Sequence, residues 1–365
     1  MYRFKYSFLL LLFAGITVAS CTLSKVGKFD KVFSFDRNTI EKSESEFVCQ
    51  LSEDSIFLGQ IKDFTLLNDT SFVVVDGRGS YLYHISGTLQ KQFGNSGRAE
   101  GEMLSPSLVY ATPKFVYIWC STLMKLLVFD HESHFITELS DLKIGVTKFI
   151  VDANDENVCF YTNGITVQLE NKVIDVVAIY NISQKTLMKY GERKNEDEVL
   201  SVWSNSGGLY TDNNRLIYLH PGNLIIYDFD LNSGMTFMYK IKDKAFQREE
   251  VINAYDLIQN RPKLHDYILK SSFVKGLYCV NGQFIIVSEI GQFDPQNSNT
   301  QDGLKNRKIK LYIFDSSFAP NRTILYDYIS SPNTVIYSNA MYFLTLNVDG
   351  DDQIITLNRF PLAKE

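Results

Sequence analysis

The sequence has little of what marks several common classes of protein. Only 8 of its 365 residues are proline, none of its 5 cysteines stands in a C-x-x-C spacing, and its formal net charge is −6. Scarce proline and a hydrophobic content of 45% describe a folded chain and not a disordered tail. Without that cysteine spacing, no structural zinc motif is present. The acidic balance argues against nucleic acid as a partner, because nucleic-acid binders gather Lys and Arg on one face.

Motifs typical of catalysis are missing as well. The sequence contains no G-x-S-x-G turn, H-E-x-x-H helix or P-loop. His131-Glu132-Ser133-His134 is predicted to be a hairpin tip and not a metal site, because metalloprotease histidines need an i, i+4 spacing on a helix. An active site assembled from scattered loop residues would leave no such motif. An enzyme is therefore the less favoured reading, and catalysis stays open.

Long apolar runs are confined to the N-terminus. Arg3 and Lys5 precede an apolar segment from Phe8 to Val18 that is too short to span a bilayer. Ala19-Ser20-Cys21 follows, and it resembles the lipobox of bacterial lipoproteins, in which a small residue precedes a Cys whose thiol receives a diacylglyceryl group. Val18 stands where Leu is usual in that pattern. The segment therefore predicts a lipoprotein signal peptide and lipidation of Cys21.

The signal defines the expected N-terminal organisation. Residues 1–20 are the predicted signal peptide, and residues 21–45 are the predicted lipidated tether. Two or more acyl chains, palmitate among them, would hold the protein stably on a bilayer. Thr22, and not Asp, follows Cys21, which by resemblance to known sorting patterns favours the outer membrane with the protein facing the periplasm. The expected location is the bacterial cell envelope.

Four cysteines remain if Cys21 carries lipid. Cys49, Cys120, Cys159 and Cys279 would then lie in an oxidising compartment, where disulfides form. A domain of this size has enough core to be stable without disulfides, so buried free thiols are the simpler expectation. The sequence leaves both possibilities open.

Strand-forming residues are abundant and recur in a regular order. The chain contains 26 Phe and 21 Tyr, and six pairs of apolar runs follow one another along it. The pairs are Phe72–Val75 with Tyr81–Ile85, Phe115–Ile118 with Leu126–Phe129, Val158–Tyr161 with Val176–Tyr180, Leu216–Leu219 with Leu224–Tyr227, Phe284–Val287 with Leu311–Phe314, and Met341–Leu344 with Ile354–Leu357.

A further short run precedes each pair, and a fourth follows most of them. The preceding runs are Phe64–Leu67, Leu108–Ala111, Phe149–Asp152, Gly208–Thr211, Gly276–Val280 and Thr334–Ser338. Six repeating units of four antiparallel strands predict an all-β, six-bladed β-propeller over residues 46–365. The sixth unit ends almost at the C-terminus, so an N-terminal strand is needed to complete it. Phe47–Leu51 is the first candidate for that strand and Val32–Phe35 the second.

The first unit has the most regular order. It reads Val73-Val74-Val75-Asp76-Gly77, Tyr81-Leu82-Tyr83, Ser86-Gly87, Lys91-Gln92-Phe93-Gly94, and Gly97-Arg98-Ala99-Glu100-Gly101-Glu102 before Pro106. On these residues the chain resembles the six-bladed TolB-like or NHL-like propeller lipoproteins of Bacteroidetes, over residues 62–106 as a motif and residues 45–360 as an architecture. The resemblance implies glycines in left-handed interblade turns and implies no defined activity.

The long insertions are predicted to open on one face. Gly94–Ser105, Glu192–Ser206, Ile241–Lys275 and Glu289–Lys308 all fall between second and third strands or between units. Binding groups tend to be carried on such connections. Within the third insertion, Val251, Tyr255 and Ile258 have helical spacing, so residues 245–260 are predicted to form a helix that ends at Arg261-Pro262. It is either a lid or a packing insertion.

Polar residues near strand ends on that face are the candidate ligand-binding residues. They are Asp76, Arg78, Lys125, His220, Glu289 and Asp349. Each is also readable as an ordinary solvated side chain. Asp228–Gly234 is predicted to be a polar β-turn because its spacing does not fit a calcium loop. Asn347–Asp352 is the one oxygen-rich cluster that suggests calcium, with a solvated hairpin as its alternative, and no other cofactor is expected.

These features favour a noncatalytic binding module that is anchored to a membrane and presents its long-loop face to a protein, peptide or glycan. The alternative is a propeller hydrolase or lyase that acts on a saccharide or lactone at the mouth of the channel. A third reading is an accessory subunit of an envelope complex whose partner covers the same face.

Overall fold

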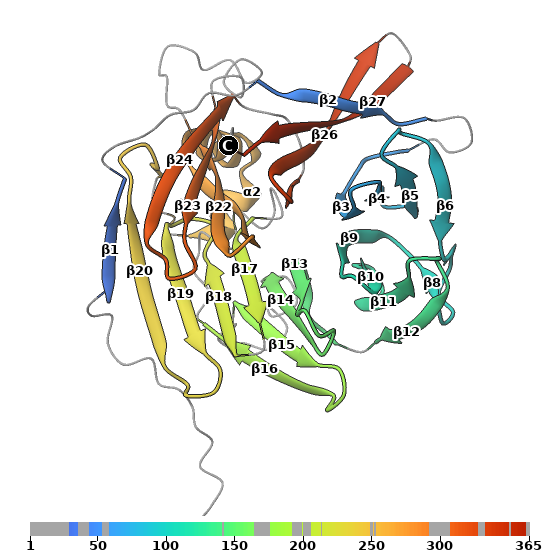
Figure 1. The fold of residues 1–365 in the computed structure, drawn as a ribbon, viewed down its shortest axis with the longest axis horizontal. Helices are drawn as coiled ribbons and strands as arrows, with labels where there is room; N and C mark the ends of the chain where they lie inside the picture. Colours follow the sequence, from blue (N-terminus) through green and yellow to red (C-terminus); the bar gives the residue numbers. More distant parts are fainter. Residues whose placement is uncertain are drawn as a thin grey trace, which may run out of the picture.

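The structure is a computed structural model that describes residues 29–35, 44–52, 58–140, 142–163, 176–191, 199, 206–212, 214–248, 251, 253–291, 307–327, 333–349 and 352–362. Six antiparallel sheets surround a common axis, as Figure 1 shows. The predicted six-bladed propeller is confirmed. Within the described ranges, no helix is long and apolar enough to cross a membrane.

Each blade has a core of four strands, which follow one another from the axis outward in sequence order in all blades except blade 6, where β2 is outermost. Blade 1 contains β3 (Asp63–Asn68), β4 (Ser71–Val75), β5 (Ser80–His84) and β6 (Leu89–Phe93), and blade 2 contains β9 (Pro106–Ala111), β10 (Phe115–Cys120), β11 (Lys125–Asp130) and β12 (Phe135–Leu139). Blade 3 contains β13 (Gly145–Val151), β14 (Asn157–Asn163), β15 (Val177–Asn181) and β16 (Thr186–Tyr190), and blade 4 contains β17 (Gly208–Asp212), β18 (Arg215–Leu219), β19 (Ile225–Asp230) and β20 (Thr236–Lys242).

The strands of blade 5 and the two middle strands of blade 6 are longer than the strands of most other blades. Blade 5 contains β21 (Phe273–Val280), β22 (Gln283–Ile290), β23 (Lys308–Phe314) and β24 (Pro320–Asp327), and blade 6 contains β25 (Thr334–Tyr337), β26 (Ala340–Asp349), β27 (Asp352–Pro361) and β2 (Glu46–Gln50). Two short strands, β7 (Asn95–Ser96) and β8 (Glu102–Met103), pair in the connection between blades 1 and 2.

Alternation of side chains explains why the second strands are apolar throughout. In β4, Phe72 and Val74 pack in the cluster shared with blade 6, whereas Val73 and Val75 pack in the cluster shared with blade 2. Successive strand residues point to opposite faces, and both faces of this blade are covered by neighbouring blades. An uninterrupted apolar run is therefore the pattern that a blade interior requires.

The ring is closed by the first of the two candidate strands. β2 pairs antiparallel with β27, and Cys49 lies opposite Leu357. The second candidate has another place, because β1 (Lys31–Ser34) pairs in parallel with β20 as a fifth strand of blade 4. Phe33 of β1 is buried between Tyr239 and Phe314. Part of the segment that was expected to be tether therefore belongs to the folded body.

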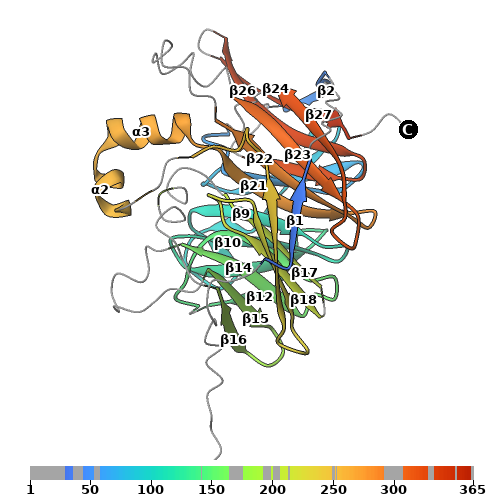
Figure 2. The same cartoon turned by 90° about the vertical axis from the view of Figure 1, so that its left-hand side faces the viewer.

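The helical insertion differs from the prediction. α2 (Ala254–Gln259) and α3 (Arg261–Lys270) follow each other, so the predicted start at residue 245 was wrong and the helical part extends to residue 270. Arg261-Pro262 ends α2 as expected but begins α3, because Pro needs no hydrogen bond in a first helical turn. Figure 2 shows the two helices projecting from one face of the propeller.

The remaining cysteines are free thiols on separate blades. Cys49, Cys120 and Cys159 are buried and Cys279 is half-buried. They belong to blades 6, 2, 3 and 5 respectively. Burial raises the pKa of Cys49 and of Cys120 to about 11, so both thiols stay protonated at neutral pH.

Candidate functional site

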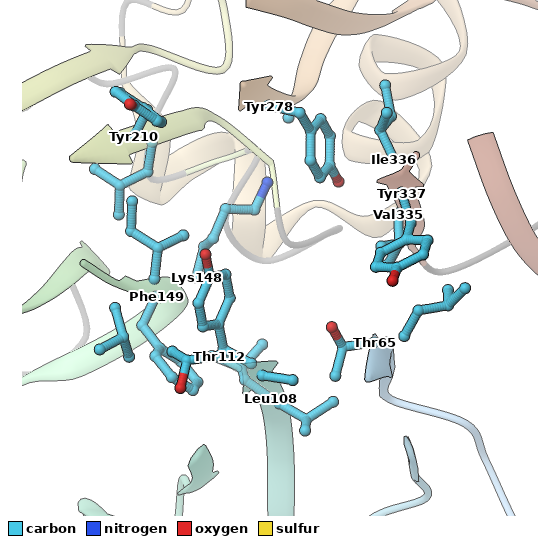
Figure 3. Close-up of a pocket in the computed structure, with 18 of the residues that line it drawn as sticks. Thr65, Leu108, Thr112, Lys148, Phe149, Tyr210, Tyr278, Val335, Ile336 and Tyr337 are labelled. Atoms are coloured by element: carbon cyan, nitrogen blue, oxygen red, sulfur yellow. The ribbon is translucent and has the colours of Figure 1, made fainter. Parts of the chain in front are cut away.

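The central channel contains a cavity of about 800 Å³ that is lined by the innermost strand of every blade. These strands are β3, β9, β13, β17, β21 and β25. They all start at the face on which the long insertions open, here called the loop face, and they end at the opposite face, called the turn face. Figure 3 shows Lys148, Phe149, Tyr210, Tyr278 and Tyr337 around this cavity. Its walls combine aliphatic and aromatic side chains, with polar groups toward the two ends.

Asp63 lies at the loop-face end of the channel, on one side of the cavity. Its carboxylate accepts hydrogen bonds from the Phe64 amide at 2.9 Å, from the Val109 amide at 2.9 Å, and from the side-chain amide of Asn333. Burial raises the pKa of Asp63 to about 7, although these hydrogen bonds and the charge of Lys148 act to lower it. The carboxyl group is thus partly protonated at neutral pH.

Lys148 lies at the same end of the channel, on the other side of the cavity. Its ammonium group donates to the backbone carbonyl of Gly207 at 2.8 Å and to that of Lys275. Burial lowers the pKa of Lys148 to about 7, and the attraction of Asp63 only partly offsets that effect. A cavity that faces an amine and a carboxyl group, both titrating near neutrality, is a recognised mark of a functional site.

These groups also connect the blades. Asp63 of blade 1 bonds to Val109 of blade 2 and to Asn333, which precedes blade 6. Lys148 of blade 3 bonds to residues at the starts of blades 4 and 5. The Tyr278 hydroxyl, from blade 5, donates to the carbonyl of Thr334 in blade 6. The polar end of the channel therefore has a structural role in addition to any role in binding.

The turn-face end has a different arrangement. His131 lines the cavity there, and its ring nitrogen lies 3.0 Å from the carbonyl of Thr112. The motif that contains His131 connects β11 and β12, so the predicted hairpin is confirmed. Asp152 accepts hydrogen bonds from the Glu156 amide at 2.8 Å and the Asn157 side chain at 2.7 Å. In the part of the chain that the structure describes, no group of three His, Cys, Asp or Glu residues is placed to hold a metal ion.

The candidate residues of blades 1 and 2 lie at the loop face but one layer out from the channel. Asp76 is buried after β4 and accepts hydrogen bonds from the amides of Gly59, Arg78 and Gly79. Arg78 is exposed in the same turn. Lys125 is buried and donates to Glu138 at 2.8 Å and to the carbonyl of Ala99 at 3.0 Å. None of the three candidates lines the cavity.

The other candidates have similar positions. His220 is buried, with its ring edge-on to Tyr218 and Tyr227. Glu289 is buried and forms an ion pair with Arg307 and a longer one, at 3.6 Å, with Lys275. Arg307 in turn donates to the carbonyls of Ile268, Leu269 and Ser271 at the end of α3.

The last candidate and the calcium cluster can be followed only in part. Asp349 ends β26, and its side chain lies outside the described residues, as do Gly350 and Asp351 of the cluster at Asn347–Asp352. Asp228–Gly234 forms the β19–β20 hairpin, where Asp230 accepts from the amides of Asn232 and Ser233, so the predicted turn is confirmed.

Asp63 and Lys148 were missed by sequence reasoning because both lie in the innermost strands. Polar residues were sought near the ends of second strands and the starts of third strands, but those strands lie at least one strand spacing, about 4.8 Å, farther from the axis. The available signal was a charged residue near the start of a first strand, as in Asp63, Lys148 and Lys275. In a first strand, every second residue points in the same direction, so a charged residue at the right position faces the channel.

Comparison with known proteins supports the fold. No protein-family model matches the chain, and no curated protein matches its sequence. Among solved structures, an exported protein from Bacteroides fragilis shares 13% identity with a TM-score of 0.55, covering 90% of this chain and 99% of its own. A member of the DUF4221 family from Bacteroides vulgatus shares 8% identity with a TM-score of 0.58, covering 87% of this chain and 98% of its own. These similarities show a shared propeller architecture.

Proposed function

We propose that this protein is an exported, lipid-anchored binding module that takes the end of a peptide or glycan into the loop-face end of its central channel. The observation that carries the proposal is the cavity of about 800 Å³ with Asp63 and Lys148 at that end. Ligand sites are typically concave and mostly apolar, with a few convergent polar groups. A Bacteroides protein of similar fold is described as exported, which agrees with the signal segment of this chain.

The chemistry of the lining favours a ligand with both flat and polar parts. Tyr210, Tyr278 and Tyr337 offer aromatic rings, and Thr65 and Tyr337 add hydroxyl groups. The Tyr210 and Tyr278 hydroxyls already donate to Asp212 and Thr334. Sugar rings and peptide ends combine such surfaces with hydrogen-bonding groups. Lys148 and Asp63 would then select the polar end of the ligand by charge-assisted hydrogen bonds.

A ligand screen with a blocked channel tests the proposal. Thr65 lines the cavity, so Thr65→Phe should fill part of it, whereas Thr186→Phe places the same side chain on the exposed outer strand of blade 3. Glycan fragments and peptides would be screened by thermal shift. A ligand that stabilises the wild type and Thr186→Phe, but not Thr65→Phe, supports the channel site. A ligand that stabilises all three proteins equally binds elsewhere and contradicts it.

Catalysis at the same place is the second candidate function. Asp63 and Lys148 both titrate near neutrality and face the cavity, as a general acid and a general base must. A hydrolase or lyase acting on a saccharide or lactone would show turnover that follows these two ionisations. Loss of turnover in folded Lys148→Met protein, together with retained ligand binding, would favour the enzyme over the binding module.

The anchor completes the proposal. Lipidation of Cys21, attachment to the outer membrane with the propeller facing the periplasm, and membership of the TolB-like or NHL-like lipoproteins remain predictions from the sequence. Mass spectrometry of the N-terminal peptide from the native membrane tests lipidation directly. Cys21→Ala should leave the propeller folded and remove the acyl mass. An unacylated N-terminus in the wild type would refute the anchor without affecting the channel site.

A further inference from the structure

Exposed apolar side chains gather on one edge of the propeller. Among the described residues, ten large hydrophobic side chains are exposed, and five of them lie on the outer parts of blades 3 and 4. These five are Val32, Leu187, Met188, Met235 and Phe237. Met235 is 55% exposed and Met188 is 46% exposed. Clustered exposed apolar residues mark interaction surfaces more often than scattered ones do.

Four of the five residues lie on two outer hairpins of neighbouring blades, and Val32 lies on the strand that covers the side of blade 4 (Figure 1). Leu187 and Met188 belong to β16, Met235 and Phe237 belong to the β19–β20 hairpin and to β20, and Val32 belongs to β1 beyond β20. Figures 1 and 2 both place the β15–β16 and β19–β20 hairpins at the lower edge of the propeller. We call these five residues, with the lysines described next, the blade 3–4 edge.

The same edge carries four lysines in a protein of net charge −6. Lys185 and Lys189 are exposed at β16, Lys31 is exposed on β1, and Lys240 lies on β20 beside them. Carboxylates lie among these lysines and keep their charge: Asp30 accepts from the Met238 amide, and Asp230 accepts from its own turn. Asp228 pairs with Arg215, and the charge of Lys31 helps to lower the pKa of Asp315. Lysines beside exposed apolar side chains suit a surface of anionic lipid headgroups.

The N-terminal segment meets the molecule at this edge. The amide of Asp30 donates to the carbonyl of Met238 at 3.0 Å, and the Asp30 carboxylate accepts from the Met238 amide at 2.8 Å. Cys21 precedes Phe29 by eight residues. Eight extended residues span at most about 28 Å. Acyl chains on Cys21 would therefore hold a bilayer within reach of the blade 3–4 edge.

We propose that the blade 3–4 edge rests on the anionic phospholipid surface to which Cys21 is anchored, so that the propeller stands on its rim. The proposal rests on the lipid anchor of the proposed function. Apolar side chains would enter the interface between headgroups and acyl chains, and the lysines would contact phosphates. Both ends of the channel would then open parallel to the membrane.

Hydrogen exchange on the lipidated full-length protein tests this orientation. The protein would be placed in vesicles of phosphatidylethanolamine with phosphatidylglycerol and compared with the same protein in nonionic detergent. Residues 182–190 and 231–240 should exchange about tenfold more slowly on vesicles, since the lipid covers them. Residues 131–139, at the outer edge of blade 2, are the internal reference and should exchange equally in both.

Two matched substitutions sharpen the test. Met188 on β16 and Ile136 on β12 both lie on outer strands and are 46% and 49% exposed. Met188→Glu should abolish the slowing at 182–190, whereas Ile136→Glu should leave it unchanged. The proposal is overturned if all three segments of the wild-type protein exchange at the same rate on vesicles as in detergent. It is also overturned if the slowing depends on protein concentration and not on lipid, because the edge would then contact a second copy of the protein. An N-terminus without acyl mass overturns the anchor instead.

Discussion

The two ends of the central channel are built differently. At the turn face, Asp152 and Asp212 bond to groups only two to five residues away, including the Asn157 side chain and the Asn214 amide. At the loop face, Asp63 and Lys148 bond to groups on other blades, such as Val109 and Gly207. The turn-face carboxylates cap their own turns, whereas the loop-face charges depend on the closed ring. Substitutions should therefore have unequal effects at the two ends.

Loss of the Asp63 carboxyl group should have the largest effect. Asp63→Ala leaves the Val109 amide and the Asn333 side chain without this acceptor in the channel wall. We expect the free energy of unfolding to fall by about 2–3 kcal/mol. Urea unfolding at pH 6 measures it. A loss below about 0.5 kcal/mol would mean that channel water replaces the carboxylate and that Asp63 does not join the blades.

The second-largest effect should be the pH dependence of stability that Lys148 causes at the loop-face end. The pKa of Lys148 is about 7 in the folded protein, whereas the ordinary pKa of a lysine is 10.5. Between pH 7 and pH 10.5 the unfolded chain therefore binds more protons than the folded protein does. Wild-type stability should therefore rise with pH above 7.5, by up to about 1.4 kcal/mol per pH unit, relative to Lys148→Met. Urea midpoints of both proteins from pH 7.5 to 9.5 measure the difference. Parallel curves would show that Lys148 keeps an ordinary pKa.

Asp63 acts in the opposite sense at lower pH. Its folded pKa of about 7 lies above the ordinary value of 3.8, so the folded protein binds more protons between them. This contribution is fully present at low pH and is lost as the pH rises toward 7. Wild-type stability should consequently fall from pH 5 to pH 7 relative to Asp63→Ala, provided that both proteins are measured by the same unfolding probe. A rise instead would contradict the buried position of the carboxyl group.

Turn-face substitutions should have smaller effects. Asp152→Ala removes the acceptor for the Glu156 amide and the Asn157 side chain and should cost about 1 kcal/mol. Asp212→Ala removes the acceptor for the exposed Asn214 amide and for a long, 3.4 Å bond from the Tyr210 hydroxyl, and should cost about 0.5 kcal/mol. Thermal unfolding of the two variants measures both losses of stability. A cost at Asp212 equal to that at Asp63 would remove the distinction between the two ends of the channel.

Features that depend on the local order of apolar and polar residues could be predicted from the sequence, and features that depend on distant partners could not. The second strands, such as Phe72–Val75 in β4, are apolar because both blade faces are covered, so the repeat and the blade number were visible in the sequence. The closing strand around Phe47 followed from counting strands. The site did not follow, because Asp63 and Lys148 obtain their partners from residues such as Asn333 and Lys275 that are far away in the sequence. The same reason hid the partner of β1: Val32–Phe35 was a candidate only for closing the ring, whereas β1 pairs with β20, which begins at Thr236.

The closing strand has a consequence for how the protein is made. Glu46 of β2 forms its ion pair with Arg359 of β27, 313 residues later. A chain that leaves the ribosome from its N-terminus delivers β2 long before its partner exists. Pairing at such separation has a high entropic cost and is slow to form. The last blade should therefore assemble only after the whole chain has arrived, which leaves the first and sixth blades exposed to proteases and chaperones in the interval.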